Sequence, residues 1–179
     1  IESASHVAVC SAVTYGTNPP SSGHHYGLFP SFGTYEYAIP RGFWVHALEH
    51  GSVWIAYNPD KISGDALKTL SAKINGQPYS IMSPYPNLDQ PISLQSWGHQ
   101  LKLSDPNDPR IDEFIQSLRT NQYQYPEPGA RCDALGPGLF DQDNPPPYKP
   151  APPVSAVNNT TVMPEVIAGA QGVAPDPTK

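Results

Sequence analysis

The histidines are the residues whose type and spacing point to chemistry in this sequence. His24 and His25 are adjacent, and His46 and His50 lie four residues apart in the segment HALEH, which also contains Glu49. Side chains four residues apart share a face in a helix and also in a strand, so the two imidazoles converge in either conformation. Neutral imidazoles are the commonest metal ligands, and three or four of them suit zinc or copper. The sequence therefore predicts a metal site where the segment of His24 and His25 folds over HALEH.

A purely structural interpretation stays open, because paired histidines are often polar groups satisfied by backbone hydrogen bonds. Enzyme patterns are missing: HALEH is not the HExxH of zinc proteases, and neither Gly-x-Ser-x-Gly nor a glycine-rich phosphate loop occurs. The adjacent carboxylates of Asp112 and Glu113 suit the solvated first turn of a helix. We expect a protein that is not an enzyme.

The elements that must position these histidines are both strands and helices. Ser63 and Gly76 bracket a helix over 64–75, and Asp108 followed by Pro109 begins a second helix. HALEH itself is compatible with helix or strand. Segments rich in apolar, β-branched and aromatic residues predict strands at 6–9, 53–57, 79–82 and 92–103. This order predicts an α+β fold, with a small mixed or antiparallel sheet and two helices on one face.

Length and composition set the domain organisation. A chain of 179 residues suits one domain, and 23 prolines with 15% charged residues argue against a long helical bundle. The net charge of −6 disfavours nucleic-acid binding, and no apolar run is long enough for a transmembrane helix. We predict an α+β domain at 1–133 and an extended proline-rich tail at 134–179.

The tail is expected to bind a protein partner. Residues 137–179 contain ten prolines, and such a segment cannot build a core of its own. Proline-rich segments dock on other surfaces at low entropy cost, which favours a neighbouring chain over the tail's own domain. The residues expected to contact the partner are Pro145, Pro146, Pro147, Tyr148, Pro150, Pro152 and Pro153.

Several features favour an exported, extracytoplasmic protein, either periplasmic or at the cell surface. The chain begins at Ile1 instead of Met, as expected either after removal of a leader or anchor or for a fragment of a longer chain. Cys10 and Cys132 lie near the two ends of the expected domain, and a disulfide between them would contribute about 4–5 kcal/mol in the chain-entropy treatment. Two unrelated buried thiols are the alternative. Asn158 and Asn159 begin overlapping glycosylation sequons.

Four segments, taken in order, resemble a known family. They are PPSSGHHY at 19–26, VHALEHGSV at 45–53, PISLQSWGH at 91–99 and the pair Pro126 and Glu127. They resemble the PPxSGxHY, VHxLEHGxV and PIxLTxWGR motifs of a bacterial family catalogued as domain of unknown function 3105. The resemblance covers about residues 5–132. It implies an exported or membrane-anchored protein and brings no established reaction.

The resemblance also bears on the site. His25, His46, Glu49 and His50 match positions of the family motifs, whereas His24 stands where the family usually has proline. His99 likewise replaces the arginine of WGR, which puts any anion-binding role there in doubt. Because the motif histidines come from separated segments, as a site requires, the family identity strengthens the metal interpretation.

The expected ligands are His25, His46 and His50, with Glu49 as a fourth ligand or as the acceptor of an imidazole N–H, and His24 as an additional candidate. Copper is the first choice and zinc the second, on the expectation that Met82 lies nearby.

Two functions follow from these observations. The first is an exported copper- or zinc-binding module that acts as an accessory subunit of an extracytoplasmic assembly. It would reach the membrane through that assembly or through a removed N-terminal anchor. The second is a purely structural subunit without metal, whose tail wraps a partner and whose histidines are internal hydrogen-bonding groups.

Overall fold

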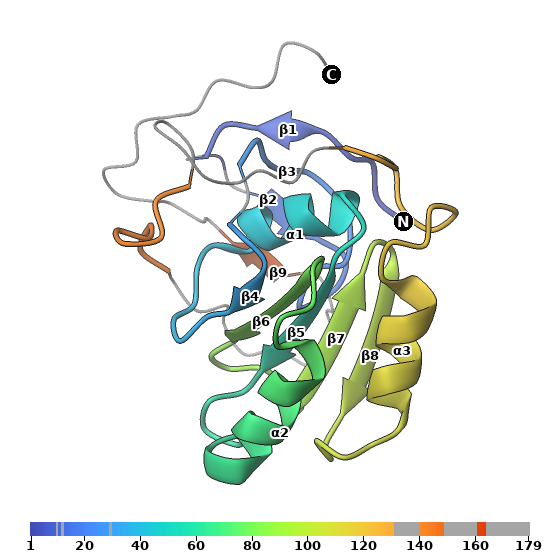
Figure 1. Ribbon diagram of the computed structural model, residues 1–179. Coiled ribbons are helices and arrows are strands. Elements are labelled where there is room, and N and C mark those ends of the chain that lie inside the picture. Colours follow the sequence, from blue (N-terminus) through green and yellow to red (C-terminus); the bar gives the residue numbers. More distant parts are fainter. Residues whose placement is uncertain (10, 12, 29, 131–139, 149–160, 164–179) are drawn as a thin grey trace.

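The computed structural model describes residues 1–9, 11, 13–28, 30–130, 140–148 and the backbone of 161–163 (Figure 1). Within these residues it contains three helices and nine strands. In chain order these are β1 His6–Val7, β2 Val13–Tyr15, β3 His25–Tyr26, β4 Gly33–Thr34, α1 Arg41–Glu49, β5 Val53–Tyr57, α2 Gly64–Ile74, β6 Ser80–Pro84, β7 Ile92–Ser96, β8 His99–Leu103, α3 Arg110–Leu118 and β9 Thr161–Met163.

A five-stranded mixed sheet in the order β4-β6-β5-β7-β8 forms the centre of the molecule. β6 pairs in parallel with both β4 and β5, whereas β7 pairs antiparallel with β5 and β8. Two small pairs complete the strands: β1 lies parallel to β3, and β2 lies antiparallel to β9. The prediction of an α+β fold with a small mixed sheet is confirmed.

Two helices cover one face of this sheet, as predicted. Leu70 of α2 and Ile111 of α3 belong to a buried cluster with Val53 and Ile55 of β5. Alternate residues of β5 point to opposite faces, and all five are buried, so the strand needs a cover on its other face as well. A third helix supplies that cover.

The third helix, α1, lies on the opposite face and settles the conformation of HALEH. Trp44 and Leu48 of α1 share a second buried cluster with Trp54 and Ile81 of the sheet. The ring centroids of Trp44 and Trp54 lie 5.8 Å apart. Pro40 precedes the first helical residue, a position where the absent N–H of proline costs no helical hydrogen bond. HALEH is therefore the last turn of a helix packed between the sheet and β3, which lies beside it in Figure 1.

The single strand expected at 92–103 is instead a hairpin of β7 and β8. Ser96 pairs with His99, so Trp97 and Gly98 form the turn. Gly98 has a φ of +73°, a conformation that a residue with a Cβ rarely adopts. The turn places the ring of Trp97 edge-on to His25, with centroids 6.1 Å apart.

The two predicted helix starts differ in how they are capped. Ser63 stands at the cap position of α2 but makes no side-chain cap hydrogen bond. Pro109 stands at the cap position of α3, and the carboxylate of Asp108 just before it accepts hydrogen bonds from the backbone N–H and the guanidinium of Arg110. These bonds hold the pKa of Asp108 at about 2.

Besides β9, the structure describes residues 140–148 of the proline-rich tail, and this segment packs against its own domain. Phe140 is buried and its ring centroid lies 5.1 Å from that of Phe43. The amide of Gln142 donates a hydrogen bond of 2.7 Å to the Tyr35 hydroxyl. Tyr148 faces Tyr85, with 6.5 Å between centroids. Binding of a partner through Pro145, Pro146, Pro147 and Tyr148 stays a prediction.

Other expectations fall outside the described residues. These are the partner contacts of Pro150, Pro152 and Pro153 and the disulfide between Cys10 and Cys132. Among the described residues, no helix has the length and apolar character needed to cross a membrane.

Candidate metal centre

One turn of α1 presents three polar side chains to the same side. His46, Glu49 and His50 are spaced i, i+3 and i+4, and these positions share a helix face. All three are buried. His50 is the residue at which the helix ends. The helical conformation therefore adds Glu49 to the face of the two histidines, where a strand would have turned it away.

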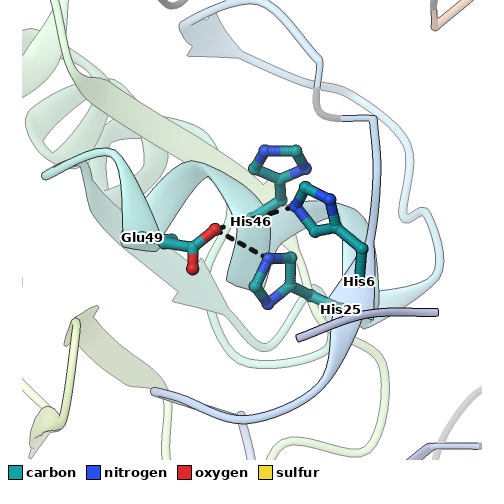
Figure 2. Close-up of side chains that lie close together, drawn as sticks. All are labelled: His6, His25, His46 and Glu49. Carbon is teal, nitrogen blue, oxygen red and sulfur yellow. Dashed lines mark hydrogen bonds and ion pairs between the residues drawn. The ribbon is translucent and has the colours of Figure 1, made fainter. Parts of the chain in front are cut away.

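The parallel pair of β1 and β3 brings two more histidines to this face. His6 is the register partner of His25, so their side chains stand next to each other. Figure 2 shows the rings of both residues directed toward His46 and Glu49. The ring centroid of His46 lies 4.6 Å from that of His6 and 5.0 Å from that of His25. His25 is fully buried, and the side chain of His6 is only 4% exposed.

The donor atoms of these four residues are close enough to share one ion. The Oε2 atom of Glu49 lies 2.8 Å from Nε2 of His25 and 3.8 Å from Nε2 of His6. One ligand atom from each of His6, His25, His46 and Glu49 lies within 4.8 Å of all the others. Ligands bound tetrahedrally at about 2.0–2.1 Å are about 3.3 Å apart. The cluster thus needs only small side-chain movements to surround a cation.

Two of the imidazoles are oriented by backbone carbonyls. Nδ1 of His25 donates to the carbonyl oxygen of Gly23 over 2.9 Å, and Nδ1 of His46 donates to that of Tyr26 over 2.6 Å. A proton on Nδ1 leaves Nε2 as the metal-binding nitrogen of each ring, and in His25 an ion would displace the proton that now lies between Nε2 and Glu49. Metal-ligating histidines almost always have such a partner on the other ring nitrogen. Gly23 has a φ of +117°, so the glycine of the PPSSGHHY segment makes this turn possible.

Electrostatics keep His46 in the form that binds metals. Burial lowers the pKa of His46 well below 6.5, and repulsion from His25, His50 and His6 lowers it further. The hydrogen bond to the Tyr26 carbonyl opposes this shift but is the smallest contribution. His46 is therefore neutral at physiological pH, as a metal ligand must be.

A second group of donors adjoins the first. Nε2 of His50 lies 3.1 Å from Nε2 of His46 and 3.3 Å from Oε2 of Glu127. Because Nε2 of the neutral His46 carries a lone pair, Nε2–H of His50 donates this hydrogen bond. Donor atoms of Glu49, His50 and Glu127 also lie within 4.8 Å of one another. Glu49 thus belongs to both groups.

The structure brings most of the predicted ligands together and separates two residues from them. His25, His46 and Glu49 lie in the four-residue cluster, and His50 lies at its border. His24 is exposed, and its Nδ1 is hydrogen-bonded to the Ser5 hydroxyl. Met82 is buried in the cluster on the other face of the sheet, so it offers no sulfur to the histidines. The expectation that Met82 lies near the site is therefore wrong.

His6 and Glu127 are the members of these groups that sequence reasoning missed. His6 begins the predicted strand at 6–9, and no spacing rule links it to residues further along the chain. The one sequence feature that marks His6 is its position as a polar residue at the start of an apolar strand. That feature points to the site only once β1 is seen to pair in parallel with β3. Glu127 lies in the Pro-Glu pair that resembles the family pattern, but the sequence alone did not indicate that its carboxylate is a candidate ligand.

One of three comparisons with known proteins identifies the family of this chain. A search of curated proteins found no match, and neither did a search of solved structures. A family model described as "Protein of unknown function (DUF3105)" matches residues 6–134. The matched region begins at His6 and contains every residue of both donor groups. The chain therefore belongs to the DUF3105 family of proteins of unknown function.

Proposed function

We propose that this protein binds a zinc or copper(II) ion through His6, His25, His46 and Glu49. The observation that carries the proposal is the convergence of three imidazoles and one carboxylate, from three separate segments, within mutual ligand distance. Two of the imidazoles also have the backbone acceptor on Nδ1 that fixes Nε2 toward the centre. Burial of all four side chains limits competition from water.

A metal explains this arrangement better than a structural polar cluster does. Three imidazole rings lie within 5.0 Å of one another, centroid to centroid, in a buried place beside the carboxylate of Glu49. Burying polar groups costs free energy unless each finds a partner. His25 is hydrogen-bonded to Glu49 over 2.8 Å, and His46 to the Tyr26 carbonyl and to His50. A cation at their centre would bind one atom of each of the four residues and bring a positive charge to the buried carboxylate of Glu49.

The donor set favours zinc over copper. Zinc commonly takes four ligands drawn from histidine nitrogen and carboxylate oxygen in a tetrahedron. Copper(II) also accepts nitrogen and oxygen donors but prefers a tetragonal arrangement, and soft sulfur ligands would favour copper(I). Met82 lies across the sheet from the histidines, so the softer donor is missing from the described cluster.

We further propose that the metal-binding domain is an accessory subunit of an extracytoplasmic assembly, without catalytic activity of its own. Support comes from the resemblance to an exported family, and from the prolines of the tail as a docking segment. The purely structural alternative is favoured by one observation, the direct bond between His25 and Glu49, which holds the two residues without any ion.

Elemental analysis of the purified full-length chain, followed by zinc and copper titrations of the chelated protein, tests the proposal. We expect bound zinc or copper, and a loss of at least about 100-fold in affinity for His25→Gln, because a ligand is removed. His24→Gln is the matched control, since His24 is adjacent in sequence but exposed. A chain that binds neither ion at micromolar concentrations contradicts the metal function and leaves the structural one.

A further inference from the structure

We infer that the centre holds two divalent cations, with Glu49 as the bridging carboxylate. The inner ion is the one proposed above, and the inference rests on that proposed function. The outer ion is held by Glu49, His50 and Glu127, which form the second group of donors within 4.8 Å of one another.

The contacts of His50 indicate a candidate ligand that is not one of the four residues around the inner ion. Its Nε2 lies 3.1 Å from Nε2 of His46 and 3.3 Å from Oε2 of Glu127. A metal at this position takes the place of the Nε2 proton that His50 now donates. The proton then resides on Nδ1, which costs little because the two neutral tautomers of imidazole are close in energy.

The grouping of the donors favours two ions over one ion with five ligands. Two ligands of one ion, each bound at about 2.0–2.2 Å, cannot lie more than about 4.4 Å apart. His50 lies close to His46, but it groups with Glu49 and Glu127 and does not join the complete set of His6, His25, His46 and Glu49. Paired ions that share a carboxylate are about 3.5–4 Å apart.

Glu49 is placed to serve both ions. Its Oε2 atom faces His25 and His6, and a carboxylate has two oxygens that can each accept a metal bond. Glu127 reaches the same region from the segment after α3. Its backbone N–H donates to the backbone oxygen of Glu49 over 3.4 Å, which fixes the two residues relative to each other.

Charge and exposure make the outer ion the weaker one. Two divalent ions carry four positive charges, and the carboxylates of Glu49 and Glu127 offset two of them. The side chain of Glu127 is 25% exposed, compared with 4% for Glu49. The outer ion therefore has three protein ligands and an open side toward solvent, where water completes its coordination.

Zinc titration of the chelated full-length chain, with bound metal counted by elemental analysis, tests the pair. We expect two ions per chain with separate affinities. His50→Gln and Glu127→Gln should each bind a single ion at close to the higher affinity, and His99→Gln, outside both groups, should still bind two. With copper(II), two bridged ions should couple magnetically, so the electron paramagnetic resonance signal of the doubly loaded chain should be weaker than that of two isolated ions.

Each other outcome has a definite meaning. One ion in the unaltered chain, with the same affinity in Glu127→Gln, overturns the pair and leaves the proposed function standing. One ion whose affinity falls in His50→Gln makes His50 a ligand of the inner ion, which also overturns the pair. No ion at all removes both proposals. Circular dichroism of every variant confirms that a lost ion is not a lost fold.

Discussion

His6 and His25 are register partners in the parallel pair of β1 and β3, and their ring centroids lie 4.8 Å apart. Glu49, on the neighbouring helix, lies 2.8 Å from one of these rings and 3.8 Å from the other, measured from its Oε2 atom to each Nε2. The N-terminal segment thus contributes to a site whose other members lie much later in the chain.

His6→Gln is expected to weaken zinc binding by at least about 100-fold, because it removes one of the inner donors. The two-residue pair of β1 with β3 keeps its backbone hydrogen bonds in this variant, so the fold should be unchanged. Competition with a chromogenic chelator measures the affinity. Equal affinities for His6→Gln and the unaltered chain would exclude His6 from the site.

Chelation of the bound ion is expected to lower the melting temperature. An ion present at about 100 times its dissociation constant stabilises the folded state by about 2.7 kcal/mol. For a domain of this size that corresponds to a shift of about 5–10 °C. Differential scanning calorimetry with and without chelator measures the shift. His25→Gln serves as the control, because its melting temperature should respond far less to chelator.

The free energy of unfolding of the metal-free chain is expected to decrease as the pH is lowered below about 6.5. The pKa of His46 is lowered well below 6.5 by burial and by repulsion from its histidine neighbours. Below pH 6.5 the unfolded chain therefore takes up a proton at His46 that the folded chain refuses. The contribution is about 1.4 kcal/mol per pH unit until the folded pKa is reached. Urea unfolding at pH 8 and pH 5.5 measures it.

His46→Asn is the control for this pH dependence. The variant removes the titrating group, so its free energy of unfolding should change less between the two pH values than that of the unaltered chain. An identical change in both proteins would assign the effect to other groups.

Gly42→Ala is expected to destabilise the fold by about 1–2 kcal/mol. A Cβ at Gly42 would lie 2.8 Å from two ring atoms of the buried Tyr26. Overpacking of this kind costs about 1–3 kcal/mol, and the better helix propensity of alanine offsets at most about 1 kcal/mol. Displacement of Tyr26 also moves the carbonyl that accepts from His46, so zinc affinity should fall as well. Urea unfolding and zinc competition measure the two effects.

Gly27→Ala is the matched control for that substitution. Gly27 follows Tyr26 directly, but the nearest atom to a Cβ there is Nδ1 of His6 at 3.8 Å, an ordinary contact. Stability within about 0.5 kcal/mol of the unaltered chain is expected for Gly27→Ala. Equal losses in both variants would argue against close approach as the cause.

Phe140→Ala is expected to cost about 3–5 kcal/mol, because it removes a buried aromatic ring that packs on Phe43. Tyr123→Ala, at a position that is 84% exposed, should change stability by less than about 0.5 kcal/mol. Urea unfolding of both variants measures the difference. A small loss in Phe140→Ala would show that the segment at 140–148 contributes little to the domain.

The sequence by itself determined the features that depend on local patterns. The strand at β5 and the helices α2 and α3 follow from residue type, helical spacing and terminal residues, all of which act within one element. His25, His46 and Glu49 could be selected because closely spaced imidazole and carboxylate groups are typical of metal ligands. The family could be assigned for the same reason, since its motifs are contiguous.

Only the tertiary structure decided how these parts meet. All nine residues of α1 are buried, so no solvent-exposed face marked its helical period. HALEH stayed ambiguous until the sheet and β3 enclosed it. Met82 was separated from the histidines because alternate residues of β6 face opposite sides of the sheet. His6 and Glu127 joined the two donor groups through contacts between distant segments. Contacts between distant segments leave no repeating pattern in the sequence, because the path of the intervening chain is not fixed by local residue spacing.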